Sequence, residues 1–311
     1  MMIELQSVTK LYGTVIGVND ITLSLAPGAY GLLGPNGSGK TTLLNLITGQ
    51  LRPTIGRVTV MGQSPWNRDE LLRQIGLCPA VDVLYPNVSA FQWVSYLVEL
   101  HGIPRNEAAE AAAIALDQVG MSGAMNRPMG TYSLGMRQRT KLAQAFAHQP
   151  ELLILDEPFN GLDPIGRHEM TVVLREWIRN GRSLILASHI LHEVEAISPS
   201  FLLIRGGRLL ASGTPDEVHT MLAEVPNEIR IRCDKPRELS QLLVAEGLVD
   251  SLRLDDDGQS IVAATRNPRS VYEQLPKWID RLDLQVHEMR SGDDSLHNLF
   301  SSLMRMHRGE L

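Results

Sequence analysis

An α/β fold built on a parallel sheet is predicted by three stretches of the sequence. Residues 34–42 read Gly-Pro-Asn-Gly-Ser-Gly-Lys-Thr-Thr and satisfy the phosphate-binding loop pattern G-x-x-x-x-G-K-[ST] at every fixed position. Residues 152–155 form an unbroken apolar run, and residues 183–187 form a second run that is apolar after Ser183, and both are typical of strands buried on both faces of a parallel sheet. A glycine loop in a chain of buried strands predicts a phosphate-binding α/β fold.

The flanks of the glycine loop agree with this interpretation. Ala29–Leu33 reads as a short buried strand, and Leu43–Ile47 reads as an apolar helix. Glycines allow backbone N–H groups to surround a polyphosphate because no Cβ blocks the approach. Lys40 can reach the β- and γ-phosphates, and the Thr41 hydroxyl can bind Mg²⁺. A chance glycine-rich turn is the alternative for the motif alone, and both flanks argue against it.

Two acidic residues follow the apolar run 152–155 directly. Open α/β sheets bind their ligands at the carboxyl ends of the strands, which is where Asp156 and Glu157 stand. Asp156 is suited to hold Mg²⁺, directly or through water, and Glu157 is suited to orient and deprotonate an attacking water. An acidic turn after a strand is the alternative, but it leaves the glycine loop unexplained.

Two further side chains keep two interpretations each. His189 follows the second apolar run, where it either contacts a γ-phosphate or is an ordinary loop histidine. Tyr12 lies upstream of the glycine loop, where it either stacks on a nucleotide base or packs in the core.

Composition narrows the class of protein. The 311 residues suffice for one large core, or for a large and a small one. Lys and Arg number 29 against 35 Asp and Glu, so no nucleic-acid partner is expected. Cys78 and Cys233 lack metal-ligand spacing and are expected to be buried thiols in a reducing compartment. Without a signal peptide or an apolar run of bilayer length, the chain is expected to be soluble.

The chain changes character twice along its length. Residues from about 88 to 150 show helical spacing of apolar side chains, which predicts a helical insert. After residue 215 the order β-α-β-β-α-β followed by a helix predicts a small ferredoxin-like α+β unit. Its expected elements are strands at 227–233, 249–254, 260–265 and 284–289 and helices at 237–246, 271–282 and 295–306. The acidic run 255–257 is interpreted as a hairpin turn rather than a Ca²⁺ site.

Together these motifs resemble the nucleotide-binding domain of ABC transporter ATPases over roughly the first two-thirds of the chain. The fold that this implies is a P-loop NTPase of the ABC ATPase type with a helical subdomain. Six motifs occur in the family's order: the aromatic Tyr12, the Walker A loop Gly34–Thr42, the signature Tyr132–Met136, Walker B at Leu152–Glu157, the D-loop Asn160–Asp163 and the switch residue His189.

The resemblance implies an ATPase whose ligands are ATP and Mg²⁺. The implied catalytic residues are Glu157, His189 and Lys40, and the implied metal ligands are Thr41 and Asp156. The residues implied to bind the nucleotide are Tyr12, Gly34, Pro35, Asn36, Gly37, Ser38, Gly39, Lys40, Thr41, Thr42, Ser133, Gly135 and Asp163.

One position departs from the family pattern. The family usually carries glutamine, which touches Mg²⁺ and the attacking water, where this chain has Ala80. Either another group substitutes or hydrolysis is slower, since losing one orienting contact costs on the order of 10²-fold in rate. The remaining site is complete, so an active ATPase is still expected.

The signature implies a dimer. In the family, the signature serine and glycine of one subunit close over the γ-phosphate bound by the other subunit. This chain has one phosphate loop and one signature, so Ser133 and Gly135 are expected to act in trans, in a homodimer or in a heterodimer of ATPase subunits.

The stretch Ile75–Pro79 with residues 82–87 resembles the A subfamily of ABC transporters and related bacterial exporters. This implies an ATPase domain at 1–222, an accessory or regulatory domain at 223–311, and export through separate integral-membrane subunits. The chain is then expected to be cytoplasmic and peripheral on the inner face of the membrane. The alternatives are a soluble ABC ATPase acting on ribosomes or DNA and a nucleotide-gated regulator with little turnover.

Overall fold

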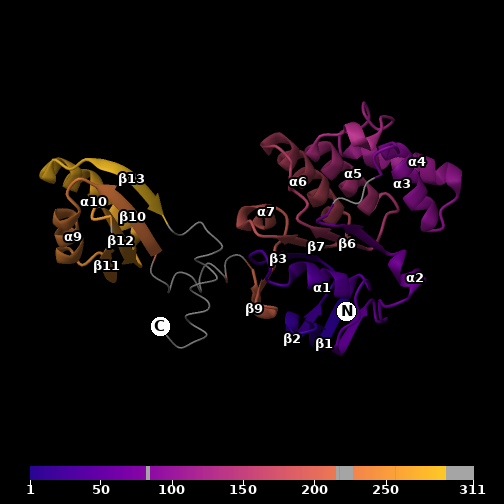
Figure 1. Cartoon of the computed structure of the whole chain (residues 1–311), viewed down its shortest axis with the longest axis horizontal. Helices are drawn as coiled ribbons and strands as arrows, with labels where there is room; N and C mark the ends of the chain where they lie inside the picture. The colour runs from indigo at the N-terminus through magenta and orange to yellow at the C-terminus, as the bar shows by residue number, and fades with distance from the viewer. Residues whose placement is uncertain (82–84, 215–216, 218–226, 256, 292–311) are drawn as a thin grey trace. The chain divides into compact units, whose positions relative to one another are not determined.

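A computed structural model of the chain describes residues 1–81, 85–214, 217, 227–255 and 257–291. The chain divides into two compact units, Met1–Thr214 and Pro215–Leu311 (Figure 1). The border expected after residue 222 and the helix expected at 295–306 lie outside the described residues.

A three-stranded antiparallel sheet opens the first unit. Its strands are β1 (Ile3–Tyr12), β2 (Val15–Leu25) and β4 (Ile55–Val60), in the order β2-β1-β4. Register shifts interrupt the β1–β2 ladder between Leu5 and Leu11.

A six-stranded sheet forms the centre of the first unit. Its order is β5-β6-β7-β3-β8-β9, and every pair from β5 to β8 is parallel. The strands are β3 (Ala29–Leu33), β5 (Ile75–Cys78), β6 (Leu152–Asp156), β7 (Ser183–Ser188), β8 (Phe201–Arg205) and β9 (Arg208–Gly213). All residues of β6 and β7 are buried, which confirms the prediction made from the two apolar runs.

Helices cover both faces of this parallel sheet. Helix α1 (Lys40–Ile47) contacts β2 and β4 of the antiparallel sheet as well as β6, so it packs between the two sheets (Figure 1). The further described helices of this unit are α2 (Asp69–Leu72), α3 (Ala90–Leu100), α4 (Arg105–Gln118), η1 (Met129–Thr131), α5 (Leu134–Phe146), α6 (Pro164–Arg179) and α7 (Leu191–Glu195).

The helical insert consists of α3, α4 and α5, which pack on one another. Ser89 begins α3 with a capping box, in which its hydroxyl accepts from the Gln92 N–H and the Gln92 side chain accepts from the Ser89 N–H. Helix α5 also packs against β5, so the insert is anchored to the edge of the central sheet. Helices α3, α4 and α5 lie within the stretch 88–150, where the spacing of apolar residues predicts a helical insert.

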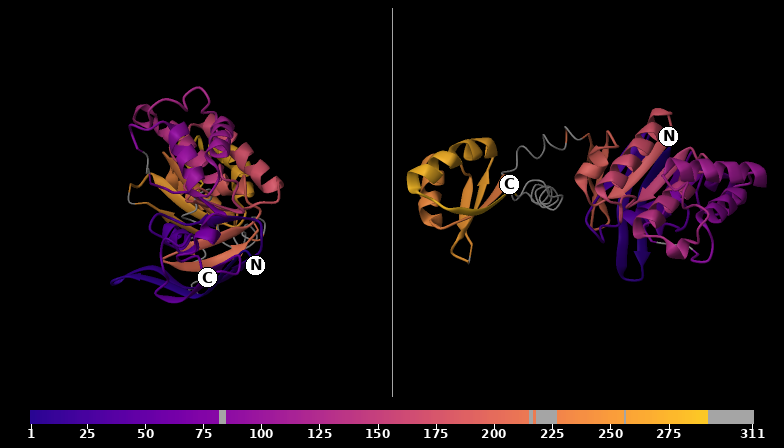
Figure 2. Two further views of the ribbon diagram at one scale, coloured as in Figure 1. Left: turned by 90° about the vertical axis from the view of Figure 1, so that its right-hand side faces the viewer. Right: turned by 90° about the horizontal axis from the view of Figure 1, so that it is seen from above.

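The second unit is a four-stranded antiparallel sheet with two helices. Its elements are β10 (Asn227–Cys233), α9 (Pro236–Ala245), β11 (Ser251–Leu254), β12 (Ser260–Thr265), α10 (Pro268–Leu282) and β13 (Val286–Ser291), and the strand order is β11-β12-β10-β13. Ile231 pairs with Ile261, and both pack with Leu239 of α9 and Trp278 of α10 in one core. Both helices therefore cover the same face of the sheet, as the right view of Figure 2 shows.

Both cysteines are buried, as expected. Among the described helices, none is long and apolar enough to cross a membrane.

Gly76 of β5 provides a test of the packing between β5 and α5. A Cβ at this position would lie 1.9 Å from the Ala145 carbonyl oxygen of α5, which cannot move without shifting the helix. Gly76→Ala is expected to destabilise the first unit by about 1–3 kcal/mol in urea unfolding. Gly123→Ala is the control, since nothing lies within 4 Å of its Cβ. Equal midpoints for the two variants would contradict the packing described.

His148 provides a test of acid stability. Burial, reinforced by the neighbouring His101, lowers the pKa of His148 to about 4 from its ordinary 6.5. The two rings stack with centroids 3.7 Å apart. The unfolded chain therefore binds this proton at higher pH, and stability falls as the pH drops from 6.5 to 4, by about 3 kcal/mol from this group alone. His148→Gln should flatten the curve of unfolding free energy against pH in this window, whereas parallel curves would contradict the assignment.

Candidate functional site

Three strand ends meet at one edge of the central sheet. The order β6-β7-β3 makes these strands neighbours, and because they are parallel their carboxyl ends share one edge. Asp156 ends β6, Ser188 ends β7, and the glycine loop 34–39 follows β3. The sheet therefore gathers the three sequence motifs at the place where open α/β sheets bind ligands.

The glycine loop leads directly into α1. Gly39 is the N-cap of α1 with φ at 107°, a left-handed conformation that side chains disfavour. A Cβ on Gly39 would also lie 2.4 Å from the Gly17 carbonyl oxygen. The first backbone N–H groups of α1 lack partners within the helix, so its N-terminus suits a bound anion. The hydroxyl of Ser38, next to Gly39, is buried without a hydrogen-bond partner among the described residues.

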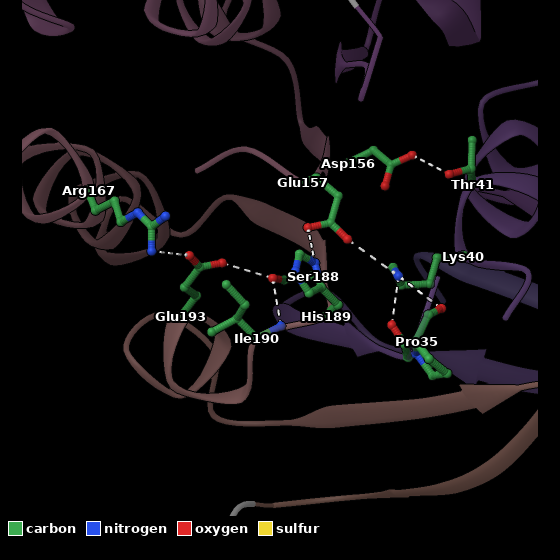
Figure 3. A network of polar contacts seen from close by, with 11 residues as sticks. Pro35, Lys40, Thr41, Asp156, Glu157, Arg167, Ser188, His189, Ile190 and Glu193 are labelled. Atoms are coloured by element: carbon green, nitrogen blue, oxygen red, sulfur yellow. Dashed lines mark hydrogen bonds and ion pairs between the residues drawn. The ribbon is translucent and has the colours of Figure 1, made fainter. Parts of the chain in front are cut away.

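Lys40 is buried at the first position of α1. Its Nζ donates to the carbonyl oxygens of Gly34 at 2.7 Å and of Pro35 at 3.4 Å, and lies 3.4 Å from Glu157 Oε1 (Figure 3). The ammonium thus lies between the glycine loop and the acidic end of β6. A bound phosphate would compete with Glu157 for this charge.

Asp156 is buried and bonded to α1. The Thr41 hydroxyl donates to Asp156 Oδ2 at 2.6 Å, while Asp156 Oδ1 is buried and has no hydrogen-bond partner among the described residues. Burial raises the pKa of Asp156, as does the charge of Glu157, whereas the Thr41 hydrogen bond and the charges of Lys40 and Lys141 lower it. A hydroxyl beside a carboxylate with a buried lone pair is a donor set that fits Mg²⁺.

Glu157 lies between a cation and an imidazole. Its backbone has φ at 51°, a left-handed value that is uncommon for a residue with a side chain. This conformation turns the carboxylate toward His189, whose Nδ1 lies 2.9 Å from Glu157 Oε2 (Figure 3). The other carboxylate oxygen faces Lys40. His189 is thus hydrogen-bonded within the site.

A second polar network holds the loop that carries His189. The buried Ser188 hydroxyl donates to Glu193 Oε2 at 2.8 Å and accepts from the Ile190 N–H (Figure 3). Its bond to Ile190 joins the residue before His189 to the residue after it. Glu193 Oε1 in turn lies 3.2 Å from Arg167 Nη1. The Arg167 Nε donates to the Leu162 carbonyl of the D-loop.

Sequence reasoning missed this network. Ser188, Glu193 and Arg167 come from β7, α7 and α6, and no motif links them. The one feature of the sequence that could have indicated this network is Ser188, a hydroxyl residue at the end of a buried strand.

Tyr12 lies close to α1 rather than in the core. It is 46% exposed, and its hydroxyl is 3.5 Å from Thr42 Oγ1. The alternative that it packs in the core is therefore wrong. The exposed ring stands beside the helix that begins with Lys40.

The signature and the D-loop form a separate exposed group. The exposed Ser133 caps α5 by accepting from the Met136 N–H, and Asp163 caps α6 by accepting from the Gly166 N–H at 2.7 Å. Gly135 lies close to Gly161. Within the described part of the chain, no hydrogen bond or ion pair joins Ser133, Gly135 or Asp163 to the glycine loop. The structure therefore brings together residues 34–42, 156–157 and 189 and leaves the signature apart.

Three proteins similar to this chain in sequence are ATP-binding proteins, in agreement with the phosphate-binding motif of the site. The family described as ABC transporter matches residues 18–160. The Nod factor export ATP-binding protein I of Rhizobium johnstonii is 32% identical over 277 residues, covering 88% of this chain and 87% of that protein. The bacitracin transport ATP-binding protein BcrA of Bacillus licheniformis is 36% identical, covering 67% and 68%. The daunorubicin/doxorubicin resistance ATP-binding protein DrrA of Streptomyces peucetius is 29% identical, covering 97% and 92%.

Solved structures agree as well. An ATP-binding subunit of an ABC transporter superposes with a TM-score of 0.66 at 26% identity, covering 71% of this chain and 93% of that one. A dimeric bacterial ABC transporter cassette reaches 0.65 at 22% identity, covering 68% and 98%, and so shows a common fold. The P-loop fold of the ABC ATPase type is thus confirmed, and the chain belongs to the ABC transporter family as one of its ATP-binding, ATP-hydrolysing subunits.

Proposed function

We propose that this chain powers the export of a substrate through membrane-spanning subunits made by other chains. The relatives named for export of Nod factor and for resistance to daunorubicin and doxorubicin support export. The observation that carries ATP hydrolysis is the position of Glu157, held between Lys40 and His189 beside the bonded pair Asp156 and Thr41.

Each residue of the site has a role in this proposal. Residues 34–42 and the Lys40 ammonium hold the triphosphate, and the exposed Tyr12 ring stacks on adenine. Asp156 and Thr41 hold Mg²⁺, which when bound neutralises charge on the phosphates. Glu157 accepts the proton of the attacking water, and His189 keeps that carboxylate oriented through the 2.9 Å contact.

The proposed active form is a dimer. Ser133, Gly135 and Asp163 are separated from the glycine loop of their own chain, yet Ser133 and Gly135 lie at the N-terminus of α5, where backbone donors suit an anion. We infer that they close over the γ-phosphate bound by a second subunit. ATP binding then joins the two subunits, and hydrolysis separates them.

By binding the membrane-spanning subunits, the chain is held on the cytoplasmic side of the membrane, at its inner face. A nucleotide-gated regulator with little turnover is the second candidate, because Ala80 offers no polar side chain to the attacking water. The rate of ATP hydrolysis separates the two candidates.

The second unit is proposed to be a ferredoxin-like accessory domain. Its element order β-α-β-β-α-β and its strand order β11-β12-β10-β13, antiparallel throughout, support that assignment. The acidic turn leading into β12 supports the hairpin interpretation, because Asp257 accepts from the N–H groups of Gln259 and Ser260. Asp256, part of the alternative Ca²⁺ site, lies outside the described residues. We assign this unit a role in dimer contact or regulation.

Glu157→Gln tests the hydrolytic role. The amide keeps the shape of the side chain but cannot accept the proton of water, so the turnover number should fall by at least about 10²-fold. ATP affinity should persist, and size-exclusion chromatography with ATP should show a dimer. Lys40→Ala is the control that should lose ATP binding. An unchanged rate in Glu157→Gln, or unchanged ATP affinity in Lys40→Ala, would refute the site.

Arg167→Gln tests the network behind His189. Loss of the contact to Glu193 should free the Ser188 turn and lower the turnover number by about tenfold, with ATP affinity unchanged. Arg175→Gln is a matched control on the same helix, because Arg175 also reaches toward α7 but contacts the Ala196 carbonyl at 2.6 Å instead of Glu193. Equal turnover in the two variants would contradict a role for the network.

Truncation after Thr214 tests the second unit. The first unit has its own core and should still bind ATP. If the second unit serves dimer contact or regulation, ATP-driven dimerisation or the ATPase rate should change severalfold. If the ATPase rate, dimerisation and transport were all unchanged, the proposed role of the second unit in dimer contact or regulation would be wrong.

A further inference from the structure

A lysine is buried beside the loop where the glutamine of the family pattern is replaced by Ala80. Lys141 of α5 has 2% of its surface exposed, and its Nζ donates to the carbonyl oxygens of Pro79 at 3.1 Å and Ala80 at 3.3 Å. Burying an ammonium is unfavourable unless acceptors compensate it. The backbone of this loop supplies two such acceptors.

The loop at Ala80 lies next to the acidic end of β6. Strands β5 and β6 are parallel neighbours, with Cys78 level with Leu155. Pro79 and Ala80 follow β5, and Asp156 and Glu157 lie at the end of β6, so the two pairs share one edge of the sheet. A shift of the Ala80 loop changes the surroundings of Glu157.

The same face of α5 also holds the backbone after Glu157. Gln138, three residues before Lys141 and buried like it, donates to the Pro158 carbonyl at 2.7 Å. Its amide lies 3.7 Å from Cys78 Sγ at the end of β5. One turn of α5 thus bonds to the backbone after β5 and to the backbone after β6. We call the edge of the sheet where these two strands end, and where Glu157 lies, the hydrolytic edge.

We propose that Lys141 is a positioning residue for ATP hydrolysis, which fixes the Ala80 loop by its two backbone contacts while Gln138 fixes the turn after Glu157. Helix α5 begins at the signature, so these bonds link the subunit-facing end of the helix to the general base. The inference rests on the proposed hydrolytic role of Glu157 and adds a residue that no motif singles out.

The test compares Lys141→Met and Lys141→Gln with the unaltered full chain. Each variant removes the charge, and neither glutamine nor methionine can make both carbonyl contacts from α5. The turnover number should fall by at least fivefold, and by up to about 10²-fold, because the hydrolytic edge is displaced. The dissociation constant for ATP and the KM should stay within threefold, because the Lys141 hydrogen bonds to Pro79 and Ala80 lie at the end of β5 and not on the glycine loop. Two variants are used because methionine alone could impair folding.

Gln144→Met is the matched control on the same helix. Gln144 accepts from the Trp93 indole N–H at 2.7 Å, so this variant loses a hydrogen bond within the helical insert but none to the Ala80 loop. Its turnover number should stay within twofold of that of the unaltered chain. The fall in its thermal unfolding midpoint measures how much stability is lost with a hydrogen bond that has no role in hydrolysis.

The outcomes decide between the inference and the proposed function. A smaller than fivefold fall in either folded Lys141 variant overturns the inference, as does an equal fall in Gln144→Met or a KM that rises by more than threefold. Failure of both Lys141 variants to fold assigns Lys141 to core stability alone and also overturns it. Absence of ATP hydrolysis by the unaltered chain refutes the proposed function instead, and is seen before any variant is tested.

Discussion

The adjacency of β6, β7 and β3 in one parallel sheet is the constraint on which the site depends. Parallel strands end at the same edge, so three segments that lie between residues 34 and 189 deliver their polar side chains to one place. Apart from Asp156 and the two serines of β7, the residues of β6 and β7 are apolar. Their complete burial in β6 and β7 supplies the stability that holds Glu157 in an uncommon left-handed conformation.

Charge balance holds the side chains together at this edge of the sheet. Lys40 faces the Glu157 carboxylate and two loop carbonyls, and Glu157 also accepts from His189. Lys40 and Glu157 are largely buried, so each depends on its partners more than surface ions do. On the proposed function, an incoming polyphosphate would offer Lys40 a stronger partner and free one oxygen of Glu157. Binding and the release of the proposed general base would then be coupled through this lysine.

Helix α5 connects this edge to the exposed signature. Its N-terminus is capped by Ser133, and its buried face bonds through Gln138 and Lys141 to the turns after β6 and β5. A second subunit that touched the signature would therefore act on a helix already bonded to the hydrolytic edge. Arg167 makes a comparable connection from the D-loop side, through Glu193 and Ser188. Both connections use buried polar groups, which tolerate little displacement.

Local chemistry encodes much of this protein. The glycine loop, the apolar runs of β6 and β7 and the capping residues of α3 specify their own conformations, so strands, helices and the residues 34–42, 156–157 and 189 could be predicted from the sequence. Tertiary packing decided the rest. The contact between Lys141 and Ala80 joins residues 61 positions apart. The polar network of Arg167, Glu193 and Ser188 joins three elements, α6, α7 and β7. No local pattern specifies such pairs, because their geometry exists only once the sheet and helices have packed.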